Sequence, residues 1–275
     1  FETALDRHVE WGLKWVDLRD SIYGKVVADL DEATAQRAKA EIEARELGVY
    51  CLSSSIFFAD IARGEAFFRE THLAGIDRII AAAKILEPRL VRMIGAVWKG
   101  RPEGPVAIDA VLSDYPWLVP VYQEGIDRFA AAGITVTIEN EAPDCILKHS
   151  TEIVQVFAAL DRPGKVGFTW DIQNQWACGV FPTLEEYAFL KPLIQYVHVK
   201  GGQFTDPDSK ALVWNAALED ASWPVRDIVA AVARDGVSPV LCLNMPFHGA
   251  EKPGYDYSGV TGRDLAFLRT IEGVA

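Results

Sequence analysis

The sequence predicts an α/β fold in which eight parallel strands, each followed by a helix, close into a (β/α)8 barrel. Apolar runs of strand length alternate with helical patterns from one end of the chain to the other. Few polar residues interrupt these β-branched runs, which is typical of parallel strands that are buried on both faces. A chain of 275 residues is a common size for such a barrel, so we expect residues 1–275 to form a single domain.

Seven strands can be placed from the apolar runs. Turn residues or the end of a helical pattern precede each run, and β-branched and aromatic residues favour extended backbone within it. The expected strands are residues 14–18, 49–53, 90–94, 134–138, 166–170, 194–197 and 240–243.

Helical periodicity fills the intervals between the strands. In the stretch 31–46, Ala35, Ala38 and Ile42 share one face, and Gly48 follows the end. Further apolar stripes predict helices over residues 68–83, 121–132, 153–160, 184–190, 225–235 and 263–271.

The eighth strand is expected before Phe1, because residues 1–11 already have the pattern of the helix that follows it. The alternative architecture is a doubly wound open sheet. No Gly-x-Gly-x-x-Gly turn follows an early strand, so the barrel is preferred.

Composition argues against two classes of partner. The formal charge is −12, and phosphate binding depends on clustered Lys and Arg, so neither nucleic acid nor an anionic membrane is expected. No apolar stretch reaches membrane-spanning length. The cysteines lie far apart in the sequence, which is typical of reduced thiols in a cytoplasmic protein. They are Cys51, Cys145, Cys178 and Cys242.

Four of the expected strands are followed directly by a single polar residue. These residues are Glu139, Asp171, His198 and Asn244. The C-terminal ends of barrel strands converge on one face, where such enzymes keep their active sites, so these side chains should lie close together. A Glu, an Asp and a His in one shell suit a divalent metal ion. The alternative for the carboxylates is an ion pair with Arg92 or Lys200, and for the histidine a place in the core.

The same strand ends carry motifs that resemble a known family. The chain resembles the xylose isomerase-like TIM-barrel superfamily, which includes the sugar phosphate isomerases/epimerases. The resemblance covers nearly the whole chain. It implies a divalent ion, with Mn²⁺ the first expectation and Mg²⁺, Co²⁺ or Zn²⁺ as alternatives, held by a Glu, an Asp, a His and a second Glu. The motifs lie in residues 134–140, 166–174 and 196–200, with further similarity in 16–19, 24–30 and 91–94.

Carried over residue by residue, the resemblance implies Glu139, Asp171 and His198 as metal ligands. Asn244 stands where the second Glu is expected. Its amide oxygen can coordinate a metal, but it brings no charge and cannot act as a base, so metal affinity should be weaker. Asn174 stands where many relatives have a histidine, and it is a candidate for substrate contact.

Other side chains near the strand ends are candidates for the reaction. Glu139 is the candidate base, and Lys200 should point to the same face of its strand as the histidine two residues earlier, where it could supply a proton. The alternative for this lysine is a solvated or ion-paired side chain. Arg92, His248 and Trp98 are candidates for binding the substrate.

Together these features favour a metal-dependent enzyme that acts on a sugar or keto-sugar through an enediolate, as isomerases and epimerases do. Without a second carboxylate at Asn244, a one-base isomerisation or an elimination is favoured over free epimerisation. The alternatives are a lyase or dehydratase, including a subunit that cleaves carbon-linked glycosides with a small partner subunit, and a metal-free binding subunit. The resemblance also includes an endonuclease branch, whose multi-zinc site uses several histidines. This chain has only five histidines in all, and its negative net charge does not suit DNA, so that branch is disfavoured. We also expect a homo-oligomer.

Overall fold

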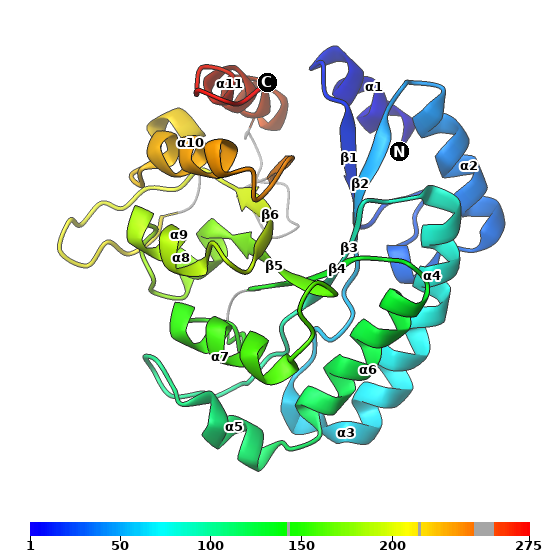
Figure 1. Ribbon diagram of the computed structural model, residues 1–275. Coiled ribbons are helices and arrows are strands. Elements are labelled where there is room, and N and C mark those ends of the chain that lie inside the picture. Colours follow the sequence, from blue (N-terminus) through cyan, green and yellow to red (C-terminus); the bar gives the residue numbers. More distant parts are fainter. Residues whose placement is uncertain (142–143, 214–215, 245–255) are drawn as a thin grey trace.

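The chain forms a nearly closed barrel of parallel strands with helices around it (Figure 1). The computed structural model describes residues 1–141, 144–213, 216–244 and 256–275. Seven strands within these residues follow one another in the sheet in sequence order, and all neighbouring pairs are parallel. A doubly wound sheet would reverse its strand order, so the predicted α/β barrel is confirmed and the open-sheet alternative is wrong. The expected eighth strand stays a prediction.

The strands are short, and each begins within two residues of the position predicted from its apolar run. Their interior residues are buried on both faces in most strands, as the uninterrupted apolar runs require. The strands are β1 (Trp15–Leu18), β2 (Gly48–Ser53), β3 (Leu90–Ile94), β4 (Val136–Glu139), β5 (Val166–Asp171), β6 (Ile194–Val199) and β7 (Leu241–Leu243).

Each predicted helix has a counterpart in the structure. These counterparts are α1 (Glu2–Glu10), α2 (Glu32–Glu43), α4 (Ala74–Leu86), α6 (Leu118–Ala131), α7 (Ser150–Leu160), α9 (Leu184–Leu190), α10 (Val225–Asp235) and α11 (Tyr257–Leu268). The last helix begins earlier than predicted because the Asp256 side chain caps it by accepting a hydrogen bond from the Gly259 N–H. Within the described ranges, no helix is both long and apolar enough to cross a bilayer.

Several short elements were not predicted, because none is long enough to show a periodic apolar face. They are α3 (Gly64–Phe67), α5 (Ile108–Asp114), α8 (Ile172–Ala177) and the 3₁₀ turns η1 (Val27–Asp29), η2 (Ile61–Arg63) and η4 (Leu218–Asp220). The π-helical turn η3 (Phe68–Leu73) forms the first part of the helix predicted over residues 68–83, and α4 forms the rest.

The strand register brings the polar strand ends to one level of the barrel. Asp171 on β5 is the register partner of His198 on β6, and Glu139 on β4 is paired with Thr169. The edges of the sheet are β1 and β7. Side chains bridge the interior between the first and sixth strands, where the Tyr196 hydroxyl of β6 donates a hydrogen bond to Asp17 of β1 at 3.1 Å.

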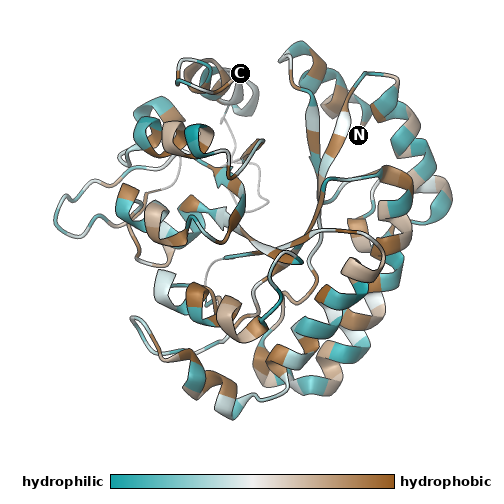
Figure 2. Cartoon of the chain, viewed as in Figure 1, coloured by the Kyte–Doolittle hydropathy of each residue, from teal (hydrophilic) through white to brown (hydrophobic). Residues whose placement is uncertain are grey.

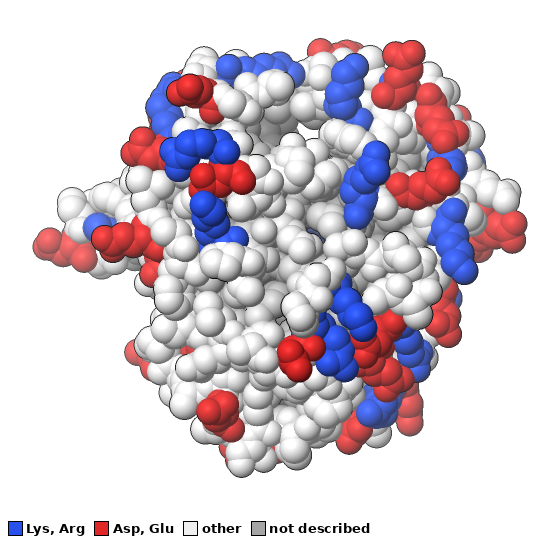
Figure 3. Space-filling model, in the orientation of Figure 1, with Lys and Arg blue, Asp and Glu red and all other residues white. Residues whose placement is uncertain are grey.

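Buried apolar residues from the strands and helices form the hydrophobic core. Figure 2 shows how hydrophobic and hydrophilic residues are distributed along these elements. Large side chains such as Phe129, Phe168 and Trp170 are fully buried there. On the face seen in Figure 3, acidic and basic side chains alternate over the helices rather than forming a single-sign patch. Ion pairs such as Lys39 with Glu87 account for part of this mixing.

Substitution of Gly201 should destabilise the fold, because a Cβ at this position would lie 1.8 Å from the backbone oxygen of Ala216. We expect Gly201→Ala to lower the free energy of unfolding by about 1–3 kcal/mol, the usual cost of overpacking. Gly262→Ala is the matched control, because nothing lies within 4 Å of its Cβ. It should stabilise α11 by about 0.5–1 kcal/mol. Urea unfolding measures the free energy of unfolding of both variants. Equal changes in the two variants would contradict the close approach of the Ala216 backbone to Gly201.

Candidate active site

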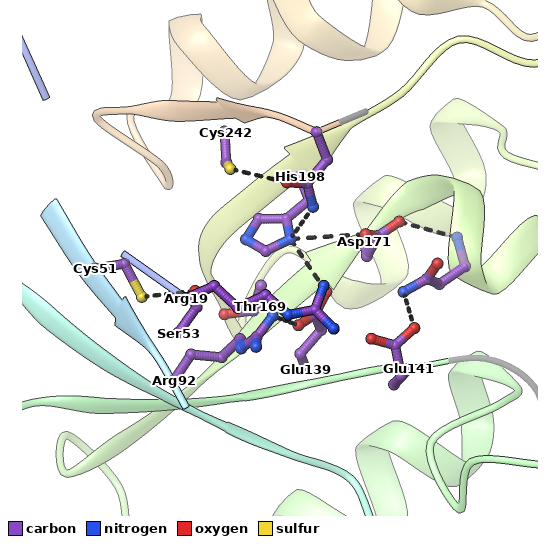
Figure 4. A network of polar contacts seen from close by, with 12 residues as sticks. Arg19, Cys51, Ser53, Arg92, Glu139, Glu141, Thr169, Asp171, His198 and Cys242 are labelled. Carbon is purple, nitrogen blue, oxygen red and sulfur yellow. Dashed lines mark hydrogen bonds and ion pairs between the residues drawn. The ribbon is translucent and has the colours of Figure 1, made fainter. Parts of the chain in front are cut away.

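Three of the predicted ligands meet inside the barrel mouth. One atom each of Glu139, Asp171 and His198 lies within 4.8 Å of the other two. The three residues end or nearly end successive strands, and none is more than 1% exposed. Figure 4 shows their side chains pointing toward one another from β4, β5 and β6. The convergence expected from the strand ends is therefore present in the structure.

The Nδ1 atom of His198 is the centre of this group. It lies 3.1 Å from Glu139 Oε1 and 3.6 Å from Asp171 Oδ2. The amide nitrogen Nδ2 of Asn244 lies 3.1 Å from the same atom. The other three residues that the sequence proposed as ligands thus lie around this ring nitrogen of His198.

Two buried cations pair with the two carboxylates. The guanidinium of Arg92, 2% exposed, donates to Glu139 Oε2. The ammonium group of Lys200 lies 2.6 Å from Asp171 Oδ2. The ion pairs considered as the alternative to a metal site are therefore both formed, and they leave Glu139 Oε1 facing the histidine.

A second layer of hydrogen bonds holds Asp171 and Lys200 in place. Asp171 caps α8 by accepting the Asn174 N–H at 2.9 Å, and Asn140 bonds to the backbone of Asp171 in both directions. The Asn174 side chain accepts from Lys200 Nζ at 3.1 Å and donates to Glu141 Oε1 at 2.9 Å. Asn174 therefore links a buried lysine to a further carboxylate beside the site.

These contacts keep the groups charged in the metal-free protein. Burial alone would raise the pKa of Asp171, but Lys200 and His198 outweigh it and hold the pKa well below its usual value. Burial also opposes the charged form of Glu139, yet Arg92 and His198 lower its pKa. Burial lowers the pKa of His198, whereas both carboxylates raise it, and the result is a pKa of about 9. In the metal-free protein, the protonated ring of His198 therefore supplies the positive charge between the two carboxylates.

The donor atoms suit a divalent ion in place of that proton. The site offers two carboxylate oxygens and one imidazole nitrogen. Ligand atoms of these types bind Mn²⁺, Mg²⁺ and Zn²⁺ in proteins. Binding through Nδ1 requires the neutral ring, so a metal and the Nδ1 proton exclude each other. The residues present therefore fit a metal bound by Glu139 Oε1, Asp171 Oδ2 and His198 Nδ1.

The remaining predicted site residues lie at different distances from this centre. Lys200 and Arg92 contact it directly, as described above. Trp98 packs against the apolar core, and the guanidinium of Arg101 lies 5.8 Å from the centre of its ring. His248 lies outside the described residues.

Sequence reasoning missed the residues on the other side of the histidine ring. Asp17 and Cys242 form a second group with His198, again with one atom each within 4.8 Å. An acidic residue inside the otherwise apolar run 15–18 was the signal that could have identified Asp17.

Comparisons with known proteins agree with the fold. The family model described as xylose isomerase-like TIM barrel matches residues 5–271. A xylose isomerase-like TIM barrel protein from Mycobacterium smegmatis, in complex with magnesium, is 20% identical with a TM-score of 0.71, over 99% of this chain and 88% of that one. No curated protein sequence matches the chain.

Two further solved structures have similar folds. The probable 3-DHS dehydratase AsbF from Bacillus anthracis is 14% identical with a TM-score of 0.72, over 98% of this chain and 93% of that one. The 3-keto-D-glucoside 4-epimerase YcjR from E. coli is 14% identical with a TM-score of 0.70, over 98% and 94%.

The metal-free protein should lose stability as pH rises through the pKa of His198. Because this pKa is raised from 6.5 to about 9, the imidazolium stabilises the fold fully below about pH 6.5, and the contribution is lost as pH rises through 9. The free energy of unfolding should fall by up to about 1.4 kcal/mol per pH unit in this window. Urea unfolding in the presence of a chelator measures it. His198→Asn should remove the slope, whereas the control His8→Asn, at a half-buried position on α1, should keep it.

Proposed function

Because the chain belongs to the xylose isomerase-like TIM barrel family, we propose that it is a divalent-metal-dependent enzyme acting on a sugar or keto-sugar through an enediolate. The observation that carries this proposal is the convergence of Glu139, Asp171 and His198 around one point inside the barrel mouth. The magnesium complex of the M. smegmatis protein and the keto-glucoside epimerase of E. coli support a metal and a sugar substrate.

The metal would be held by Glu139, Asp171 and His198, with Asn244 as a neutral fourth ligand. Mn²⁺ is the first choice, with Mg²⁺, Co²⁺ or Zn²⁺ as alternatives. Coordination by Asn244 needs its amide oxygen at the place where Nδ2 now faces His198, which is a half-turn of the amide. When bound, the ion supplies polarisation of the substrate carbonyl and stabilises negative charge that develops on its oxygen.

The chain's own residues would handle the protons. Glu139 is ionised at neutral pH because Arg92 and His198 outweigh the effect of its burial on its pKa, so it can accept the proton from the carbon beside the carbonyl. Lys200 stays protonated because Asp171 opposes the effect of burial on its pKa, so it can donate to a substrate oxygen. Arg92 retains a buried Nε–H with no partner among the described residues, which gives it one donor for a substrate hydroxyl.

The neutral ligand at Asn244 favours reactions that need one base. Isomerisation on one face of the substrate fits this set, and so does elimination of a group β to the carbonyl. The second reaction is our alternative function, either as a lyase or dehydratase or as carbon-glycoside cleavage with a partner subunit, and the dehydratase neighbour from B. anthracis supports it. Asn174, His248 and Trp98 remain proposed substrate contacts.

A metal-free binding subunit is the remaining alternative. The specific observation in its favour is that Arg92 and Lys200 already neutralise both carboxylates without a metal. We further propose that the protein works in the cytoplasm as a homo-oligomer. The free state of all four cysteines supports the reducing compartment.

Glu139→Gln should remove the base and weaken the metal site while keeping the shape of the side chain. With saturating Mn²⁺, turnover should fall by a factor of about 10² or more, the usual share of general-base catalysis. Deuterium exchange from D₂O into a panel of sugars and keto-sugars is the measurement. Glu152→Gln is the matched control, because Glu152 is equally buried and paired with Arg101 outside the site. Exchange retained in Glu139→Gln would show that another residue is the base.

Asn244→Glu should tighten metal binding, because it adds an anionic ligand next to His198. The dissociation constant for Mn²⁺ should fall by about tenfold or more, the scale on which even outer-shell ligand changes act. Calorimetric titration of the metal-free protein measures it, with Asn244→Gln as the neutral control of similar size. Unchanged or weaker binding in the Glu variant would mean that residue 244 does not face the metal.

A further inference from the structure

The imidazole ring of His198 has a second nitrogen that the proposed metal would not use. Its Nδ1 faces Glu139 and Asp171, while its Nε2 is buried and has no hydrogen-bond partner among the described residues. A buried N–H without an acceptor costs about 1–3 kcal/mol, so an acceptor is expected on this side of the ring. The carboxylate of Asp17 lies there, with Oδ2 4.0 Å from Nε2.

Asp17 has the features of an acceptor held ready for this nitrogen. Its Oδ1 is buried and has no hydrogen-bond partner among the described residues, while its Oδ2 accepts the Tyr196 hydroxyl at 3.1 Å. The pairing of β1 with β2 shifts register between Val16 and Asp17. Such irregularities re-aim a side chain beside active sites. Asp17 thus reaches from the first strand toward the sixth.

We propose that Asp17 is a positioning residue that accepts the Nε2–H of His198 and so fixes the ring in the form whose Nδ1 lone pair faces the metal site. The inference rests on the proposed function of that site. A histidine that binds metal through one ring nitrogen almost always donates the other N–H to a carboxylate, a backbone carbonyl or water.

The distance and the neighbours decide how the contact is made. At 4.0 Å the two atoms are too far apart for a direct hydrogen bond, so the contact needs an approach of about 1 Å, since N–H···O bonds centre near 2.9 Å. The other group that could accept the Nε2–H of His198 is the Cys242 thiol, which lies 3.9 Å from Asp17 Oδ2. Sulfur is a weak hydrogen-bond acceptor. Tyr196 packs against the His198 ring in a T-shaped arrangement, and its hydroxyl donates to Asp17. The carboxylate is therefore the stronger partner for Nε2.

The first test is Mn²⁺ titration of Asp17→Asn, which keeps the size of the side chain and removes its charge. We expect the dissociation constant to rise by about tenfold or more, the usual effect of losing a carboxylate behind a ligating histidine. Asp20→Asn is the matched control, because Asp20 is exposed and three residues further along the chain, and its affinity should equal that of the parent. Equal affinity in both variants would overturn the proposal.

The second test needs no variant and separates positioning from a merely structural role. In the Zn²⁺-loaded parent with ¹⁵N-labelled histidine, NMR should show the proton of His198 on Nε2 and slow exchange of that proton with water. A proton on Nδ1, or a freely exchanging one on Nε2, would overturn the proposal even if Asp17→Asn failed to fold. Mn²⁺ binding that survives in Glu139→Gln and Asp171→Asn alike would instead refute the proposed metal centre itself.

Discussion

The architecture of the site depends on one constraint, which is that five charged side chains are buried together in the barrel mouth. Arg92, Glu139, His198, Asp171 and Lys200 are all at most 6% exposed and form a continuous row of alternating charge. An isolated ion in such a place would cost several kcal/mol, and only neighbours of opposite charge offset that cost. Each residue of the row therefore depends on the others.

This dependence ties the chemistry of the site to the strand register. The row draws its members from β3, β4, β5 and β6 and from the residue after β6, and no two of its members are adjacent in the sequence. A shift of one residue in any strand would turn its charged side chain to the opposite face and leave a buried ion unpaired. The apolar runs select the fold, but the alternating charges select one register within it.

The sequence therefore predicted the strand ends and named both buried cations, but it did not predict which cation pairs with which carboxylate. Glu139, Asp171 and His198 were recognisable because each follows an apolar run, and convergence follows from the barrel alone. The choice of Arg92 for Glu139 and of Lys200 for Asp171 depends on distances that no pattern encodes. Asp17 was missed because it stands within a strand. Side chains alternate between the two faces of a strand, but the register shift beside Asp17 prevents its face from being inferred from this alternation. Short elements such as α8, which carries Asn174, show no periodicity of their own.

The balance of charges also bears on what the site can bind. Arg92 and Lys200 already compensate Glu139 and Asp171, so the positive charge of a divalent ion in this centre would not be cancelled by those two carboxylates. A second glutamate in place of Asn244 would reduce that excess, whereas the neutral amide preserves it. A site with excess positive charge and little water stabilises a ligand that carries or develops negative charge. In the proposed enzyme, Asn244 would weaken the hold on the metal and strengthen the positive field available to an enediolate, so an amide at this position fits the proposed chemistry.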